Sequence, residues 1–106
     1  RVDYPDFAVK VGEDVQSGAA ERGVLVCGTG IGMAMAAGKM EGIRAANVVR
    51  RDFAVLCREH NDANVITLSG RFVSLEDNES ILDAFIATEF AGGRHAGRVE
   101  KINALD

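Results

Sequence analysis

The fold is decided by the stretch Gly-Val-Leu-Val-Cys-Gly-Thr-Gly-Ile-Gly, which occupies residues 23–32. Its first half is a short apolar, β-branched run bounded by glycines, and such a run predicts a strand buried on both faces. The glycine-rich half predicts a turn, and residues 33–40, rich in alanine and methionine, predict a helix. A strand, a turn and a helix in this order form one unit of a parallel α/β sheet.

Upstream of this unit, residues 5–18 predict another helix. Pro5 suits the first helical turn, and the carboxylate of Asp6 favours the positive end of the helix dipole. An apolar residue recurs every four positions, as on one face of a helix. This stripe consists of Phe7, Val11 and Val15.

Downstream, the alternation of strand and helix continues. Residues 43–49 and 63–68 are apolar runs that predict two further strands. We expect the helix between them to be capped by Asp52. Its buried face is predicted to carry Phe53, Leu56, Cys57 and His60.

The last third of the chain predicts two more helices. Ser74 and Asp77 resemble a capping box, and they open a helix that the Gly92-Gly93 pair breaks. Residues 94–105 predict a short final helix. The side chains expected to face inward are Leu82, Phe85 and Ile86 in the first helix and Val99 and Ile102 in the second.

Strands that alternate with helices are joined by right-handed crossovers into a parallel sheet covered on both faces. We therefore predict a single α/β domain over residues 1–106, with a three-layer, flavodoxin-like or Rossmann-like architecture. A flavodoxin-like sheet normally has about five strands, whereas three are visible here. We expect a first strand–helix–strand unit, ahead of Arg1, to be absent from this chain.

The composition is that of an ordinary globular protein, with 47% hydrophobic and 26% charged residues. A net charge of −4 argues against nucleic-acid binding, which usually needs a basic surface. No apolar run approaches the roughly 20 residues of a membrane helix. Two cysteines in 106 residues do not make a disulfide framework, so we expect a reducing, cytoplasmic location.

Ligands of open parallel sheets bind beyond the carboxyl ends of the strands. Residues 27–32 follow the first predicted strand, and residues 69–71 follow the third. Residues 60–62 (His-Asn-Asp) lie shortly before the third strand. We expect all three polar or glycine-rich segments to share one rim of the sheet.

The glycine turn allows two interpretations. Gly28, Gly30 and Gly32 let backbone N–H groups converge on an anion at a helix N-terminus, such as a phosphate or an enediolate. The alternative is a tight turn that packs closely. The spacing is not that of the dinucleotide fingerprint, and no acidic residue ends the next strand as that motif requires.

Two side chains are candidates for proton transfer. Cys27 directly precedes the glycine turn and a helix N-terminus, which supports a thiolate, although a cysteine at a strand end is usually a small core residue. Cys57 lies within an apolar helical stripe and is interpreted as core. His60 is either an ordinary helix-end residue or, near the rim, an acid–base group.

Arginines are the candidates for binding an anion. Arg94 and Arg98 are four residues apart, so one helical turn places both guanidinium groups on one face, with His95 between them in the sequence. They form either a solvated basic face or a phosphate site. Arg71, directly after a strand, is a possible third anchor.

The chain resembles the type B ribose-5-phosphate isomerase family, which also includes galactose-6-phosphate isomerase. The matching stretches occur in family order over nearly the whole chain and are specific as a set. They are residues 3–5 (DYP), 24–32 (VLVCGTGIG), 42–45 (GIRA), 58–65 (REHNDANV) and 88–99 (TEFAGGRHAGRV).

The resemblance implies an aldose–ketose isomerase without metal or organic cofactor, acting on a sugar phosphate, most simply ribose 5-phosphate. It also implies a homodimer or a dimer of dimers with sites at the subunit interface, where the tail helix of residues 94–106 packs on the partner. The catalytic residues it implies are Cys27 as base, His60 for ring opening and Thr29. The substrate-binding residues it implies are Tyr4, Gly28, Gly30, Ile31, Gly32, Asn61, Arg71, Arg94 and Arg98.

Two departures from the family pattern bear on function. Some members use a glutamate at the position of Met33 instead of the cysteine, and because a thioether is no base, the cysteine mechanism applies here. The family also begins with a strand ending in an Asp-His pair, which this chain does not contain. Two other functions therefore stay open: a subunit of a hetero-oligomeric galactose-6-phosphate isomerase, and a non-catalytic sugar-phosphate-binding relative.

Overall fold

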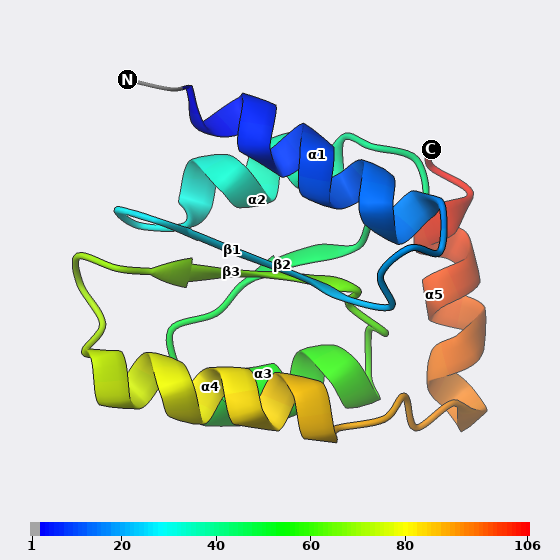
Figure 1. The fold of residues 1–106 in the computed structure, drawn as a ribbon. Coiled ribbons are helices and arrows are strands. Elements are labelled where there is room, and N and C mark those ends of the chain that lie inside the picture. Colours follow the sequence, from blue (N-terminus) through cyan, green and yellow to red (C-terminus); the bar gives the residue numbers. More distant parts are fainter. Residues whose placement is uncertain (1–2) are drawn as a thin grey trace.

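The computed structural model describes residues 3–106, which form three strands, five α-helices and one 3₁₀ helix (Figure 1). The strands are β1 (Gly23–Cys27), β2 (Ala45–Asn47) and β3 (Val65–Ser69). The helices are α1 (Tyr4–Gln16), α2 (Ile31–Gly38), α3 (Arg51–Glu59), α4 (Leu75–Ala87), η1 (Gly93–His95) and α5 (Ala96–Asn103). The predicted order of helices and strands is confirmed.

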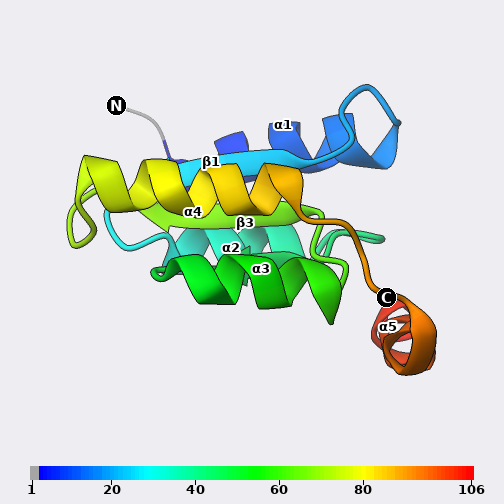
Figure 2. The same ribbon diagram turned by 90° about the horizontal axis from the view of Figure 1, so that it is seen from below.

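The three strands are parallel, in the order β1-β3-β2. Helices α1 and α2 cover one face of the sheet, and α3 and α4 cover the other (Figures 1 and 2). The predicted three-layer α/β architecture is therefore confirmed. Helix α5 belongs to neither layer and stands beyond one end of the sheet (Figure 1).

The central strand β3 joins the two halves of the core. All five of its residues are buried. Val65 packs with the α1–α2 layer, in a cluster with Leu25 and Met33. Ile66 and Leu68 pack with the α3–α4 layer. A strand covered on both faces reads as an unbroken apolar run, which is why β3 was predictable.

The interpretation of residues 23–28 as a strand buried on both faces is wrong. Strand β1 lies at an edge of the sheet, and on its second face Val24 is 37% and Val26 is 55% exposed. An apolar run alone does not distinguish an edge strand from a central one. Strand β2 is also shorter than the predicted range 43–49, because only three of its residues pair with β3.

Every predicted helix is present, but α4 already ends at Ala87 rather than at the Gly92-Gly93 pair, and not all of the predicted buried faces are confirmed. Large residues that were expected inside are exposed, namely Phe7, Phe53, Leu56, Ile86 and Ile102. Small residues lie at the closest approach to the sheet instead, among them Ala8, Ala54 and Ala84, each no more than 2% exposed. A small side chain lets a helix approach the sheet closely, and its larger neighbours then lie beside the contact rather than in it.

The helix starts also differ in detail. Ser74 caps α4 as predicted, because its Oγ accepts a hydrogen bond from the Asp77 N–H at 3.1 Å. Asp52 is not the cap of α3, since that helix begins after Arg50 and Asp52 lies in its first turn. Among the described helices, none has both the length and the apolar character needed to cross a membrane.

Candidate functional site

Cys27 ends strand β1, and its sulfur faces the glycine turn. The Gly30 N–H donates a hydrogen bond to Cys27 Sγ at 3.1 Å, and the Ile31 N–H donates to Thr29 Oγ1 at 3.1 Å. Cys27 is half-buried rather than sealed in the core. The sulfur therefore lies against the backbone amides at the start of α2. This geometry suits a nucleophile or base better than a packing residue.

Polar side chains of β2 and β3 hold the turn after β1 in place. Thr67 Oγ1 donates to the Gly30 carbonyl oxygen at 2.7 Å, and Ser69 Oγ donates to the Gly28 carbonyl oxygen at 2.7 Å. Asn47 Nδ2 donates to the Thr29 carbonyl oxygen at 3.1 Å. Thr67 and Ser69 are almost fully buried. The sequence reasoning missed Asn47 and Thr67 and placed Ser69 at the rim without a role, although a threonine inside a buried strand was a usable signal.

One glycine of the turn is required by its geometry. Gly30 has φ +85°, and a Cβ there would lie 3.0 Å from the Leu68 carbonyl oxygen and would also collide with the Asn47 amide. A Cβ on Gly32, in the first turn of α2, would displace the side chain of Tyr4, whose ring and hydroxyl lie 2.6–2.8 Å from that point. The tight-turn interpretation is therefore confirmed, while the anion cradle stays a prediction.

Arg71 and Tyr4 belong to the same rim as Cys27. The Arg71 N–H donates to the Gly28 carbonyl oxygen at 3.1 Å, and its guanidinium atoms lie 3.7–3.9 Å from the point that a Gly28 Cβ would occupy. The ring of Tyr4 faces Gly32 from the start of α1. The first group of candidate residues, at the carboxyl ends of β1 and β3, is Tyr4, Cys27, Gly28, Thr29, Gly30, Ile31, Gly32 and Arg71.

The prediction that residues 60–62 share this rim is wrong. Helix α3 returns from the carboxyl end of β2, so its last residue lies at the amino ends of the strands. Residue Val65, which follows shortly, pairs with Gly23, whereas Cys27 pairs with Ser69 at the other end. The four residue steps from one end of this strand to the other separate the two ends by about 13 Å.

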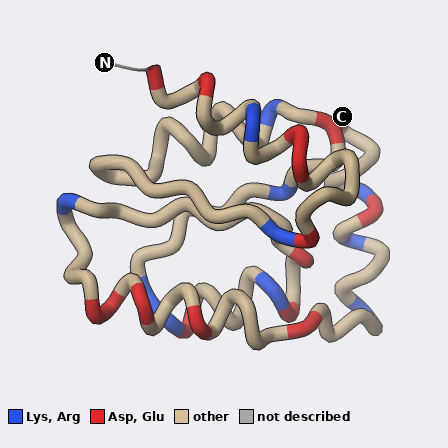
Figure 3. The backbone as a smooth tube through the Cα atoms, viewed as in Figure 1, with Lys and Arg blue, Asp and Glu red and all other residues tan. Residues whose placement is uncertain are grey.

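Helix α5 lies at this second end, as Figure 1 shows. Arg44 Nη1, just before β2, donates to Asn103 Oδ1 at 3.0 Å. His60 and His95 stack with ring centroids 4.2 Å apart and an interplanar angle of 16°. The second group of candidate residues is therefore His60, Asn61, Arg94 and Arg98, with Asn61 exposed. Figure 3 shows basic residues along α5 and few charges near the turn between β1 and α2.

The electrostatics of this second group are dominated by positive charge. Burial lowers the pKa of His95 below its usual 6.5, and positive charge on His60, Arg94 and Arg98 lowers it further. The carboxylate of Glu59 opposes the shift. The lowered pKa favours the uncharged form of His95, and within this group of residues Arg94 and Arg98 supply positive charge.

The turn of residues 60–62 is held by an ion-pair network. Asp62 has φ +49°, and its carboxylate accepts from Arg58 Nη1 at 2.8 Å and from Arg44 Nη2 at 3.3 Å. Arg58 is only 4% exposed and also donates to the carbonyl oxygens of Ala63 and Thr88. This network fixes where α3 ends and hence where His60 lies.

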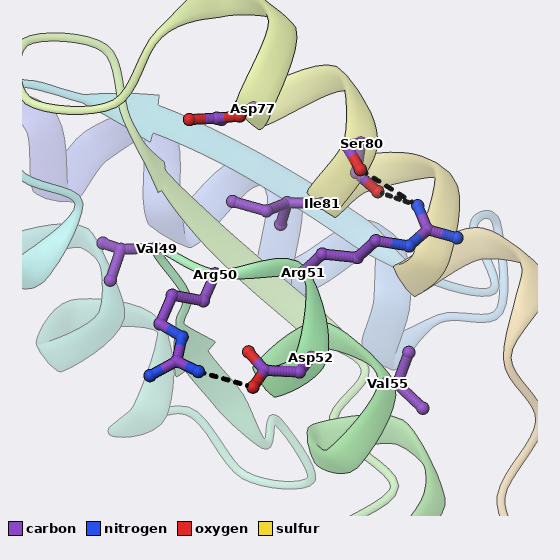
Figure 4. A pocket seen from close by; sticks show the side chains of 8 residues that line it. All are labelled: Val49, Arg50, Arg51, Asp52, Val55, Asp77, Ser80 and Ile81. Atoms are coloured by element: carbon purple, nitrogen blue, oxygen red, sulfur yellow. Dashed lines mark hydrogen bonds and ion pairs between the residues drawn. The ribbon is translucent and has the colours of Figure 1, made fainter.

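A prominent surface hollow lies elsewhere, between the first turn of α3 and helix α4 (Figure 4). None of the predicted site residues lines it. Both guanidinium groups that line this hollow donate hydrogen bonds within the chain (Figure 4). Arg50 donates to the Asp52 carboxylate at 2.7 Å, and Arg51 donates to the Ser80 carbonyl oxygen at 2.7 Å. Within residues 3–106, no three His, Cys, Asp or Glu side chains gather into a candidate metal site.

Comparison with known proteins gives consistent results. The family model described as Ribose/Galactose Isomerase matches residues 1–102. The probable ribose-5-phosphate isomerase B of Mycoplasma pneumoniae is 49% identical over 98% of this chain and 68% of its own length. The type B ribose 5-phosphate isomerase of Trypanosoma brucei superposes with a TM-score of 0.98 at 47% identity, covering 100% of this chain and 72% of that one.

A third similar protein was solved with a ligand. The ribose-5-phosphate isomerase B of Mycoplasma genitalium, with bound ribulose-5-phosphate, has a TM-score of 0.94 and 45% identity, covering 99% of this chain and 70% of that one. The chain thus spans roughly seven tenths of the length of these relatives, which agrees with its having three strands. The match over almost the entire chain, in both sequence and fold, shows that this chain belongs to the ribose/galactose isomerase family.

Proposed function

We propose that this chain catalyses the aldose–ketose isomerisation of a sugar phosphate, with ribose 5-phosphate and ribulose 5-phosphate as the pair. Membership of the family supports this reaction, and the ribulose-5-phosphate bound to the Mycoplasma genitalium relative supports the substrate. The single observation that carries the proposal is the hydrogen bond from the Gly30 N–H to Cys27 Sγ, which directs a half-buried sulfur toward the glycine turn at the rim of the sheet.

In the proposed reaction, the Cys27 thiolate removes the proton from C2 of the open-chain aldose. The electron pair forms an enediolate, whose oxygen faces the amides of residues 28–32 and the Thr29 hydroxyl. The thiol then returns the proton to C1 while the proton of the O2 hydroxyl passes to O1, so that C2 becomes the ketone and C1 carries the hydroxyl. Amide donors aimed at the enediolate oxygen contribute on the order of 3 kcal/mol each to such a transition state. His60 assists the opening of the cyclic aldose before this step.

We further propose that each site is built by two copies of the chain. Cys27 lies at one end of the sheet, while His60, Arg94 and Arg98 lie at the other, and a pentose phosphate cannot span that distance. A two-fold dimer places the same two ends against each other twice. Each site then takes the base from one copy and the histidine and phosphate-binding arginines from its partner.

The same arrangement explains the position of the tail. Helix α5 projects from one end of the sheet, outside both helical layers (Figures 1 and 2). Within its own subunit only Val99 of this helix is buried, and Ile102 is 44% exposed. We propose that residues 94–106 pack on the partner and present Arg94 and Arg98 to the phosphate, with Asn61 contacting the sugar and Arg71 approaching from the Cys27 side.

The experiment that tests the proposed function is an isomerase assay across phosphorylated and free pentoses and hexoses. The double variant Arg94→Ala, Arg98→Ala removes two charge-assisted contacts of about 1.5–3 kcal/mol each, so kcat/KM for ribose 5-phosphate should fall at least about 100-fold. Activity on free ribose should change less than about threefold. Lys101→Ala, an exposed cation on the same helix, is the matched control. Equal losses with and without the phosphate would contradict the assignment.

A further inference from the structure

We infer that His95 is a positioning residue for His60, holding its imidazole by ring stacking in the orientation that ring opening needs. The inference rests on the proposed function of His60 and adds a residue to which no role has been given. It stands on the geometry of the pair, whose rings are 4.2 Å apart and 16° from parallel.

The two rings meet because two separate segments bring them together. His60 is the C-cap of α3, and its N–H donates to the Leu56 carbonyl oxygen at 2.8 Å. His95 ends η1 and caps α5, and its N–H donates to the Gly92 carbonyl oxygen at 3.0 Å. The Ala91 N–H donates to the Glu59 carbonyl oxygen at 3.1 Å, which joins the two segments next to the rings. Both backbones are thus fixed, and the stack fixes the ring of His60.

The charges around the pair favour an uncharged His95. The charged groups that act on His95 are Glu59 of α3, Arg94 of η1, Arg98 of α5 and His60 itself. Burial and the three positive neighbours outweigh the one carboxylate, so the pKa of His95 is lowered. An uncharged His95 ring can stack on His60 without adding a second positive charge beside it.

The kinetic test separates ring opening from proton transfer at carbon. Ribose 5-phosphate is a furanose and must open, whereas ribulose 5-phosphate is acyclic because its C5 oxygen carries the phosphate. His95→Ala should lower kcat for ribose 5-phosphate about tenfold, a fraction of the 10²–10⁴ that an acid–base group supplies. Deuterium exchange from D₂O into C1 of ribulose 5-phosphate should slow by less than about twofold. His95→Phe keeps an uncharged stacking ring and should restore most of the lost kcat.

Each other outcome counts against the inference. If His95 binds phosphate directly, both His95→Ala and His95→Phe raise KM, and exchange slows in parallel with turnover. If its role is only structural, both rates fall together with the thermal midpoint, and phenylalanine gives no selective rescue. Failure of the proposed function looks different, because the parent chain itself would then catalyse neither turnover of ribose 5-phosphate nor C1 exchange of ribulose 5-phosphate.

A second readout does not depend on activity. The chain has two histidines, so NMR titration of the imidazole signals resolves both, and His95→Phe assigns them. In the parent chain, His95 should titrate below pH 6.5, and its midpoint should move up when His60 is replaced by Phe, because one positive neighbour is removed. If replacing either histidine leaves the titration midpoint of the other unchanged, the stacked arrangement is overturned.

Discussion

Replacing Cys27 by alanine is expected to reduce isomerase turnover of ribose 5-phosphate by about 10²–10⁴-fold, the range supplied by a general base. The loss should appear in kcat more than in KM, because the sulfur acts on a carbon-bound proton and not on the phosphate. C1 deuterium exchange of ribulose 5-phosphate should fall by a similar factor. Steady-state assay and exchange by NMR measure the two effects.

Cys57 offers the matched control, since it is the second cysteine in the chain. It is 7% exposed, donates to the Ala54 carbonyl oxygen at 3.2 Å, and burial raises its pKa to about 11. Cys57→Ala should therefore cost about 1 kcal/mol of stability and change turnover less than about threefold. Near-normal turnover in Cys27→Ala, or a turnover loss in Cys57→Ala as large as that in Cys27→Ala, would remove Cys27 from the mechanism.

The largest effect on stability is expected at Asp62. Asp62→Ala leaves the buried guanidinium of Arg58 without its carboxylate and gives alanine a φ of +49°. Breaking a buried ion pair costs about 3–5 kcal/mol, and the lower end applies because the side chain of Asp62 is 33% exposed. Urea unfolding followed by circular dichroism should show this loss as a lower midpoint.

Asp62→Asn separates charge from backbone strain, because asparagine tolerates positive φ. It should retain part of the stability that Asp62→Ala loses. The control is Asp52→Asn, whose pair with Arg50 is exposed on both sides and should cost less than about 0.5 kcal/mol. Equal midpoints for Asp52→Asn and Asp62→Ala would show that the network around Arg58 does not stabilise the fold.

The elements of the fold were predictable because their signals are local. Glycines bound the turn after β1, Ser74 caps α4, and the unbroken apolar run of β3 marks a central strand. The burial of particular side chains was less predictable, because it depends on how closely each helix approaches the sheet. In α3, Ala54 rather than Phe53 faces the core of the protein for this reason.

The candidate site was predictable in its residues but not in its arrangement. His60 and Asn61 lie between two strands in the sequence, and the motif does not say which end of the sheet they occupy. Their position follows from the direction of α3, which returns from the carboxyl end of β2 to the amino end of β3. The separation of His60 from Cys27 is thus a property of the topology.

That separation makes the two-copy site the central claim, and mixing two inactive variants tests it most directly. One variant is Cys27→Ala, and the other is the double variant Arg94→Ala, Arg98→Ala. In a mixed two-fold dimer, one site combines the intact Cys27 of the arginine variant with the intact tail of the cysteine variant. The second site of the same dimer carries both defects.

The two variants should be unfolded together, refolded together and assayed on ribose 5-phosphate. Random pairing makes about half of the dimers mixed, each with one of two sites intact, so about a quarter of the parent activity should return. Each variant refolded alone should stay inactive. A mixture no more active than its separate components, although mixed dimers are detected by native mass spectrometry, would show that Cys27 and the arginines do not meet across a subunit interface.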